Sequence, residues 1–276
     1  MKLGLCQLCA SDDPAENLKQ TLANLRKAAS QGAAFVLTPE VTNIVSLDRR
    51  HQSDVLRLEG DDPTLEALRS EAQALGVWLS IGSLALQSGD QDGRFVNRSF
   101  LIDPSGSIVG RYDKMHMFDV TISEQERYQE SAGYRAGHSA VMVPTSFGHV
   151  GMTICYDVRF PQLYRALAQA GADIILVPSA FSPATGEAHW EPLLRARAIE
   201  NGCFVVAAAQ TGSHAGDGSK LRKTYGHSMV ISPWGEVLLD MGTDKGVNIV
   251  EIDLKEVAKA RGRIPSLRHG VDFEGP

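Results

Sequence analysis

The stretch GMTICYDVRFPQLYR, residues 151–165, places a cysteine where an apolar run gives way to polar residues. Cys155 lies at the predicted carboxyl end of a buried strand and just before a predicted helix, where open α/β folds place their ligands and chemistry. Backbone N–H groups in such a turn could stabilise an oxyanion, and with the helix N-terminus they could lower the pKa of the thiol. The position favours a nucleophile over a buried packing residue, which is the commoner role of a free cysteine.

A nucleophilic thiol needs a base, and acyl transfer needs a group that stabilises negative charge on the carbonyl oxygen. His149 precedes Cys155 by six residues in the same predicted strand, so it would lie roughly 20 Å away, too far for a hydrogen bond. Glu40 ends an apolar run, where a carboxylate is costly unless it is paired or solvated. Lys114 lies among aromatic residues and methionines. Glu40 and Lys114 are therefore candidates, although each alone would also fit a loop charge or a surface lysine.

Alternating apolar runs and amphipathic segments predict the elements that position these residues. In the first half the order is strand, helix, strand, helix, strand and then a hairpin that turns at 103–106. The second half repeats this order, and its hairpin turns at 232–235. The predicted elements are residues 2–8, 12–32, 34–40, 61–76, 77–86 and 94–114 in the first half, and 147–157, 160–171, 172–181, 188–202, 203–210 and 226–241 in the second.

Two similar halves, each with one sheet, predict an α/β fold in which the sheets pack together and helices lie outside. We therefore expect a four-layer αββα sandwich with two pseudo-repeated halves. No low-complexity tract or Pro/Gly/Ser-rich linker divides the chain. Residues 1–276 are accordingly predicted to form a single domain.

Composition excludes several classes of partner. The 276 residues include 27 basic and 33 acidic side chains, giving a net charge of -6, and no dense Lys/Arg cluster indicates nucleic-acid binding. No apolar run approaches about 18 residues, so no membrane span is expected. The N-terminal apolar run meets Asp12 and Asp13 too early for a signal peptide, which predicts a cytoplasmic protein.

Three separated motifs resemble the Glu-Lys-Cys signature of the nitrilase superfamily of carbon-nitrogen hydrolases. They are LTPE with Glu40, RYDKMHMFDV with Lys114 and GMTICYDVRFP with Cys155. The resemblance extends from LGLCQLCAS near the N-terminus to SMVISPWGEVL, which is nearly the whole chain. The fold of that superfamily agrees with the predicted sandwich.

The resemblance implies a role for each residue. Cys155 would be the nucleophile, Glu40 the general base and Lys114 the electrostatic stabiliser of the tetrahedral intermediate. Glu130, in RYQESAGYRAG, would orient Lys114, and the backbone N–H of Tyr156 would complete the oxyanion hole. Such an enzyme forms a thioester and hydrolyses it. No metal or organic cofactor is implied.

Within the superfamily, the sequence around Cys155 and the segment 178–214 resemble amidases rather than true nitrilases. The closest resemblance is to the branch that cleaves deaminated glutathione into 2-oxoglutarate and cysteinylglycine, and the pattern of Gln210 and His214 favours it. The ω-amidase branch, which acts on 2-oxoglutaramate, and N-carbamoyl amino acid hydrolases are alternatives. An interaction scaffold that retains the site for binding is the non-enzymatic alternative.

A substrate with a 2-oxo acid carboxylate needs a cation and hydroxyl donors near the nucleophile. Arg159, at a predicted helix start, is the first candidate because an arginine fork suits a carboxylate. A structural salt bridge is its alternative role. Thr185 and His189, on a predicted loop and helix start, are second candidates for substrate binding, whereas Phe181 and Trp190 are expected in the core or the pocket wall.

The remaining cysteines are expected to be packing residues. Cys6 and Cys9 form a Cys-x-x-Cys motif in a predicted strand, where the two side chains would point to opposite faces, and Cys203 begins an apolar strand. No paired ligand spacing indicates a metal site. The family resemblance further implies a homodimer, with the C-terminal tail, about residues 262–276, at the interface.

Overall fold

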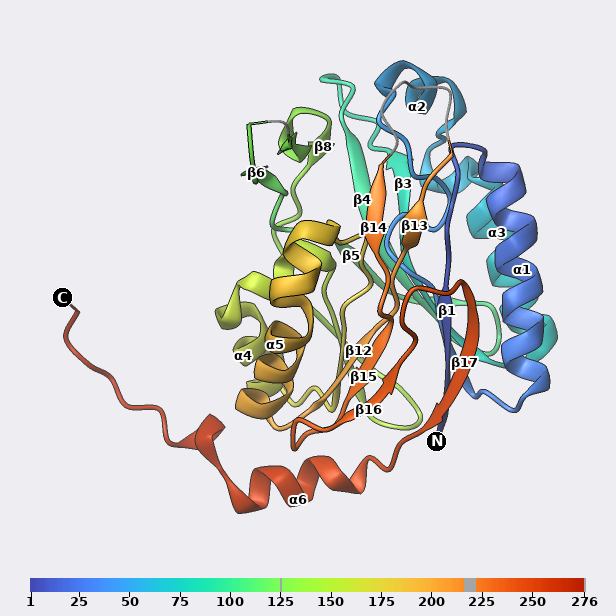
Figure 1. Ribbon diagram of the computed structural model, residues 1–276. Coiled ribbons are helices and arrows are strands. Elements are labelled where there is room, and N and C mark those ends of the chain that lie inside the picture. The colour runs from blue at the N-terminus through green and yellow to red at the C-terminus, as the bar shows by residue number, and fades with distance from the viewer. Residues whose placement is uncertain (125, 216–221, 276) are drawn as a thin grey trace.

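The computed structural model describes residues 1–276 except 125, 216–221 and 276. Two large mixed β-sheets pack face to face, and helices cover the outer face of each sheet (Figure 1). The predicted αββα sandwich is therefore confirmed. In the described part of the chain, no helix combines the length and apolar character that a membrane crossing requires.

The first sheet has three parallel neighbours at its centre, β1, β2 and β3, and β3 is followed by the antiparallel strands β4 and β5. A strand from the end of the chain, β17, pairs antiparallel with β1 and so closes the other edge. The strands, in spatial order, are β17 (Gly246–Glu251), β1 (Lys2–Gln7), β2 (Phe35–Leu37), β3 (Trp78–Gln87), β4 (Phe95–Ile102) and β5 (Ile108–Asp113), with β8 (Tyr134–Arg135) beside β4.

The second sheet repeats this plan, since the parallel neighbours β10, β11 and β12 are followed by the antiparallel hairpin β15–β16. Its other edge is closed by β9, antiparallel to β10. The predicted pseudo-repeat is thus present in the strand order. The strands, in spatial order, are β16 (Val237–Asp240), β15 (Met229–Ile231), β12 (Phe204–Ala207), β11 (Ile174–Leu176), β10 (His149–Met152) and β9 (Val141–Pro144).

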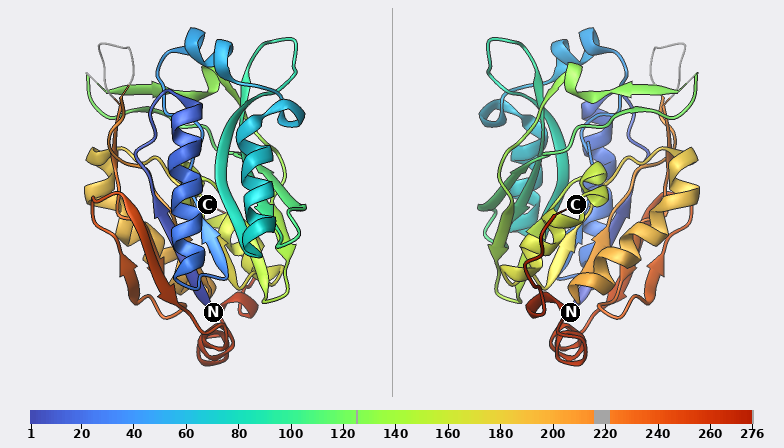
Figure 2. Two further views of the ribbon diagram at one scale, coloured as in Figure 1. Left: turned by 90° about the vertical axis from the view of Figure 1, so that its right-hand side faces the viewer. Right: turned by 90° about the vertical axis from the view of Figure 1, so that its left-hand side faces the viewer.

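The helices form the two outer layers. Helices α1 and α3 cover the first sheet and α4 and α5 cover the second, as the two side views in Figure 2 show. Asp13 and Asp62 cap α1 and α3 by accepting backbone N–H groups of the first turn. The helices are α1 (Pro14–Ser30), α2 (Arg49–Val55), α3 (Pro63–Leu75), α4 (Pro161–Gln169), α5 (Pro183–Asn201) and α6 (Lys255–Arg263).

The main core lies between the two sheets. Leu5 of β1 and Phe35 of β2 belong to the same buried cluster as Met152 of β10 and Ile175 of β11. Burying each such side chain stabilises the fold by about 1.5–3 kcal/mol relative to leaving it exposed. A second cluster packs α1 and α3 against the first sheet. These two cores hold rigid the strand ends from which the candidate site is built.

Several short elements were not predicted. Helix α2 has the sequence RRHQSDV, with one buried residue, so it offers no apolar stripe to recognise. Two small hairpins are also too short for a clear alternation, namely β6 (Asp119–Thr121) with β7 (Arg127–Gln129) and β13 (Thr211–Ser213) with β14 (Lys223–Tyr225). The edge strands β9 and β17 were missed as well.

Two predicted boundaries were wrong in ways that bear on the site. Strand β10 ends at Met152, and Cys155 lies beyond it in a short 3-10 helix, η3 (Cys155–Arg159). Helix α5 begins at Pro183 rather than at 188, so Thr185 and His189 are both helical. Pro183 is favourable at the first helical position because its missing N–H has no intrahelical partner there.

Candidate active site

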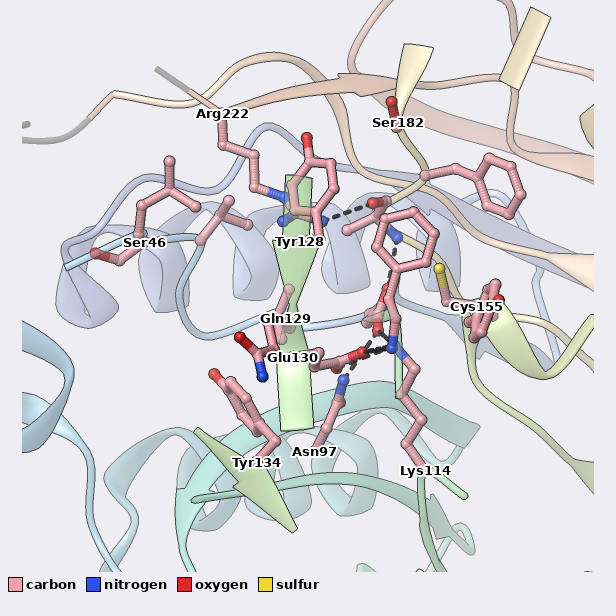
Figure 3. Close-up of a pocket in the computed structure, with 18 of the residues that line it drawn as sticks. Ser46, Asn97, Lys114, Tyr128, Gln129, Glu130, Tyr134, Cys155, Ser182 and Arg222 are labelled. Atoms are coloured by element: carbon pink, nitrogen blue, oxygen red, sulfur yellow. Dashed lines mark hydrogen bonds and ion pairs between the residues drawn. The ribbon is translucent and has the colours of Figure 1, made fainter. Parts of the chain in front are cut away.

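Glu40, Lys114, Glu130 and Cys155 line one cavity of about 240 Å³ (Figure 3). Glu40 follows the end of β2 by three residues, Lys114 follows β5 directly, and Cys155 follows β10 by three residues. Glu130 begins the 3-10 helix η2 (Glu130–Ala132), after β7. The structure therefore brings together side chains from both halves of the chain, as the sequence motifs predicted.

Cys155 lies in a strained turn. Its φ is 49°, in the left-handed region that non-glycine residues seldom occupy. The turn is held by a hydrogen bond from the Cys155 N–H to the Pro178 carbonyl, at 2.9 Å, and by the buried Asp157 carboxylate. Asp157 accepts from the Ile154 N–H at 2.8 Å and from the Tyr112 hydroxyl at 2.6 Å. This framework holds the backbone that carries the thiol. The residue as a whole is 7 % exposed, at the cavity wall.

Lys114 bridges the two glutamates. Its Nζ lies 2.9 Å from Glu40 Oε1 and 2.9 Å from Glu130 Oε2, and its side chain is only 3 % exposed. Glu130 is held in turn by the backbone N–H of Phe118, which donates to Oε2 at 2.7 Å. The alternative role as an exposed surface lysine is excluded by this burial. Lys114 is instead a fixed positive charge beside the thiol.

Glu40 has further partners that the sequence did not indicate. Asn97 Nδ2 donates to Oε1 at 2.9 Å, and the Ala180 N–H donates to Oε2 at 2.8 Å. The Glu40 carboxylate also lies close enough to the Cys155 thiol for the two groups to shift each other's pKa. Gln210 Nε2 donates to the Glu40 carbonyl at 3.0 Å and so anchors its backbone. Asn97 lies within β4, where a single polar residue in a strand does not by itself indicate a functional site.

The charges of the site are coupled through burial and pairing. Burial raises the pKa of Glu40, but the Lys114 charge, the hydrogen bond from Lys114 and the nearby Cys155 thiol together lower it below its ordinary value of 4.5. For Lys114 burial lowers the pKa, yet the Glu130 and Glu40 carboxylates raise it well above 10.5. Glu40 can therefore be ionised beside a charged Lys114 at neutral pH.

The prediction of a lowered thiol pKa is wrong. Burial and the adjacent Glu40 carboxylate raise the pKa of Cys155 well above its ordinary value, and Lys114 offsets only part of that rise. The thiol is neutral at rest because the space beside it already holds a carboxylate. This arrangement suits a general base that removes the thiol proton as the sulfur attacks.

This charge distribution predicts a broad pH profile. Glu40 must be ionised to act as a base, and its pKa lies below 4.5, so kcat/KM should stay high down to about pH 4.5 and fall only below it. On the alkaline side Lys114 keeps its charge beyond pH 10.5. The measurement is kcat/KM against pH, with folding checked by circular dichroism at each pH. An acid limb centred between pH 6 and 7 would contradict Glu40 as the base.

The structure separates the three candidates for substrate binding. Thr185 lines the cavity. Arg159 and His189 do not, because Arg159 Nη2 lies 3.1 Å from His189 Nδ1 and the guanidinium lies 5.6 Å from the centroid of the Phe181 ring. Their predicted contact with the substrate has no support in this geometry. Tyr156, whose backbone N–H was predicted to form the oxyanion hole, does line the cavity.

Three cavity-lining arginines were missed: Arg49, Arg127 and Arg222. Arg49 begins helix α2, which has no recognisable helix pattern in the sequence. Arg127 lies in a three-residue strand, and Arg222 lies just before another, β14. Their signal in the sequence is weak, since an arginine in a polar segment usually indicates a solvated surface.

The other cysteines contrast with Cys155. Cys6 and Cys203 are fully buried, and burial raises the pKa of each thiol to about 12. Cys9 is partly exposed and donates to the Ser213 carbonyl. The expected packing role therefore fits Cys6 and Cys203 better than Cys9. Across the described ranges, no three His, Cys, Asp or Glu side chains gather closely enough to hold a metal ion.

The carbon-nitrogen hydrolase family model matches residues 2–262 of this chain. The deaminated glutathione amidase of Yersinia enterocolitica is 38% identical over 270 residues, which cover 97% of this chain and 92% of the relative. The human deaminated glutathione amidase is also 38% identical, over 97% of this chain and 81% of its own length.

Solved structures agree with these relationships. The Caenorhabditis elegans NitFhit protein superposes with a TM-score of 0.90 at 36% identity, over 98% of this chain, which spans 64% of the length of that fusion protein. An amidase from Nesterenkonia superposes with a TM-score of 0.78 at 26% identity, over 96% of this chain and 98% of the other. In that structure, a glutamate-to-glutamine mutant, the active-site cysteine has added acrylamide. Sequence, fold and the convergence of a buried thiol with a glutamate–lysine pair agree, and the chain belongs to the carbon-nitrogen hydrolases of the nitrilase superfamily.

Proposed function

We propose that this amidase uses Cys155 as its nucleophile and passes through a thioester. The observation that carries the proposal is that Cys155 and Glu40 line one cavity and shift each other's pKa, with Lys114 Nζ 2.9 Å from the Glu40 carboxylate. As the sulfur attacks the amide carbonyl, Glu40 takes the thiol proton. Lys114 and the Tyr156 N–H stabilise the negative charge that develops on the carbonyl oxygen.

Collapse of this tetrahedral intermediate breaks the carbon–nitrogen bond. Glu40 returns the proton to the leaving nitrogen, so the amine or ammonia departs neutral and the acyl group remains on Cys155. A water molecule then attacks the thioester while Glu40 accepts one of its protons, and the proton passes back to the departing sulfur. The products are a carboxylic acid and an amine or ammonia. Glu130 acts through Lys114 as a positioning residue, since both of its oxygens lie about 3 Å from Nζ.

The substrate we propose is deaminated glutathione, which would give 2-oxoglutarate and cysteinylglycine. Support comes from the relatives named deaminated glutathione amidase, which match this chain at about 38% identity along nearly its whole length. Gln210 and His214, which favoured this branch in the sequence, are both buried. Gln210 anchors Glu40, and His214 bonds to Ala10 and Thr224.

A substrate panel tests this proposal. Purified protein is incubated with deaminated glutathione, 2-oxoglutaramate, an N-carbamoyl amino acid, a simple primary amide and a nitrile, and release of acid and amine or ammonia is measured. We expect kcat/KM to be highest for deaminated glutathione. A higher value for 2-oxoglutaramate would assign the chain to ω-amidase activity instead. Absence of hydrolysis across the panel would favour the scaffold alternative for this chain.

The assembly and location are part of the same proposal. The chain acts as one domain, because both sheets share the core between them, and as a homodimer in which the tail from about 262 to 276 contacts the other subunit. In Figure 1 this tail extends away from the sandwich, and it leaves Val271 80% and Phe273 85% exposed. Sedimentation of the full chain and of a chain truncated after Arg261 tests the dimer. Four free thiols are consistent with a cytoplasmic location.

A further inference from the structure

The cavity carries an excess of positive charge beyond its catalytic centre. Glu40, Lys114 and Glu130 together leave one net negative charge, because two carboxylates flank one ammonium. Every other charged side chain that lines the cavity among the described residues is an arginine: Arg49, Arg127 and Arg222. None of the three forms an ion pair with a carboxylate in the described part of the chain. Three such guanidinium groups around one cavity favour an anionic ligand.

Arg222 lies close to the reacting groups. Its Nη2 donates to the Ala180 carbonyl at 3.0 Å. The backbone N–H of Ala180 in turn donates to Glu40 Oε2. The guanidinium carbon lies 5.5 Å from the centroid of the Tyr128 ring, and Figure 3 shows the two side chains together on one side of the cavity. Stacking against an aromatic face leaves the edge of a guanidinium available to a planar carboxylate. Arg222 is half-buried, so an anionic ligand would offset the loss of its hydration.

Arg49 forms a second, more exposed arrangement of the same kind. Its guanidinium carbon lies 5.0 Å from the centroid of the Tyr134 ring, and Tyr134 also lines the cavity. Figure 3 shows Tyr134 on the side of the cavity opposite Tyr128. Gly133 makes room for this arrangement, since a Cβ built on it would overlap the Arg49 guanidinium. The φ of Gly133 is -130°, which any residue can adopt, so space rather than backbone conformation explains the glycine.

We propose that Arg222 and Arg49 determine the specificity of this cavity by binding two substrate carboxylates, one on each side of the scissile bond. The inference rests on the proposed function and specifies its substrate class. Arg222 binds the carboxylate of the acyl fragment, and Arg49 binds that of the amine fragment. The assignment follows from the order of product release. The amine departs while the acyl group is still bound to Cys155, so it should occupy the open side, where Arg49 is exposed.

Four synthetic amides test this selection without relying on any variant. The first joins the side-chain carboxyl of 2-oxoglutarate to glycine, and the second joins it to glycinamide. The third and fourth are the 4-oxopentanoyl amides of glycine and of glycinamide, in which a methyl group replaces the acyl carboxylate and the ketone is kept. On the unaltered protein, removal of either carboxylate should lower kcat/KM about 10- to 100-fold, the range expected for a charge-assisted hydrogen bond. Equal kcat/KM for all four amides would overturn the inference and leave the proposed amidase function standing. Failure to hydrolyse any of them, 2-oxoglutaramate or deaminated glutathione would overturn the proposed function itself.

Variants then assign the two arginines. Arg222→Gln should lower kcat/KM about 10- to 100-fold for the two substrates with an acyl carboxylate and change little for the 4-oxopentanoyl pair. Arg222→Lys should recover part of the loss because it restores the charge. Arg49→Gln should lower kcat/KM only for the two substrates that end in glycine, and should change little for the two that end in glycinamide. The matched controls are Arg50→Gln and Lys223→Gln, which alter exposed neighbours outside the cavity and should leave all four values unchanged. A loss of equal size on all four substrates would assign the arginines a structural role and overturn the inference.

Discussion

Cys155→Ala should abolish amide hydrolysis and leave the fold intact. The substitution removes the sulfur that forms the covalent bond and changes the volume of this buried residue only slightly. The surrounding backbone should therefore stay in place. The turn itself is held by Asp157 and by the Cys155 N–H, neither of which the change removes. Cys155→Ser should also be nearly inactive, because a carboxylate such as Glu40 does not readily ionise an alcohol. The measurement is single-turnover hydrolysis with a sensitive assay for the released acid.

A matched control is available in the same chain. Cys9→Ala alters a partly exposed thiol that does not line the cavity, so it should retain activity close to that of the unaltered protein. Thermal unfolding should be nearly unchanged for both alanine variants. Substantial hydrolysis by pure Cys155→Ala protein would remove the nucleophile assignment. Loss of activity in Cys9→Ala as well would indicate a general effect on the fold.

Lys114→Met should lower kcat by about 100-fold or more, the scale observed when one donor to a developing oxyanion is removed. Two effects combine in this variant. The positive charge near the carbonyl oxygen is lost, and Glu40 no longer has the cation that keeps its pKa low. The acid limb of the pH profile should therefore move to higher pH. Kinetics across a pH series measure both effects in one experiment.

The same variant should also be less stable at neutral pH. Removing Lys114 leaves the buried Glu40 and the largely buried Glu130 without their shared cation, and breaking a buried pair destabilises a protein by about 3–5 kcal/mol. The depressed pKa of Glu40 contributes stability above pH 4.5 that is lost as the pH falls through its value in the folded protein. The difference in stability between variant and unaltered protein should hence shrink toward acid pH. Lys223→Met, on an exposed residue, is the control. A Lys114→Met protein with normal kcat would show that Lys114 stabilises only the fold.

The sequence predicted the architecture well because its signals were strong and local. Each half contains apolar runs of strand length, helices with acidic caps and a hairpin with a Pro-x-Gly turn, and these patterns depend on neighbouring residues alone. The position of Glu40, Lys114 and Cys155 at strand ends was predictable for the same reason. Parallel strands present their carboxyl ends at one edge, so motifs far apart in the chain can meet there.

The electrostatics and the cavity wall depend on tertiary packing and were less accessible. The direction of the shift in the thiol pKa was predicted wrongly. The helix N-terminus next to Cys155 can be recognised from neighbouring residues, whereas burial and the Glu40 charge arise only when distant parts of the chain pack together. Arg159 seemed the natural carboxylate ligand from its distance along the chain, yet it turns toward His189. Arg222 lies just before the short strand β14 and Arg49 lies in the polar helix α2, and no periodic pattern predicted either element.

The most direct test of the account is detection of the thioester on Cys155. The unaltered protein is mixed with its best substrate, quenched in acid at short times, digested and analysed by mass spectrometry, and a parallel reaction contains hydroxylamine to intercept the acyl group. We predict an acyl adduct on the peptide that contains Cys155, none on the peptides that contain Cys6, Cys9 or Cys203, and formation of the hydroxamate. Turnover that produces no hydroxamate and leaves all four cysteines unmodified, or an adduct on another residue, would contradict the account.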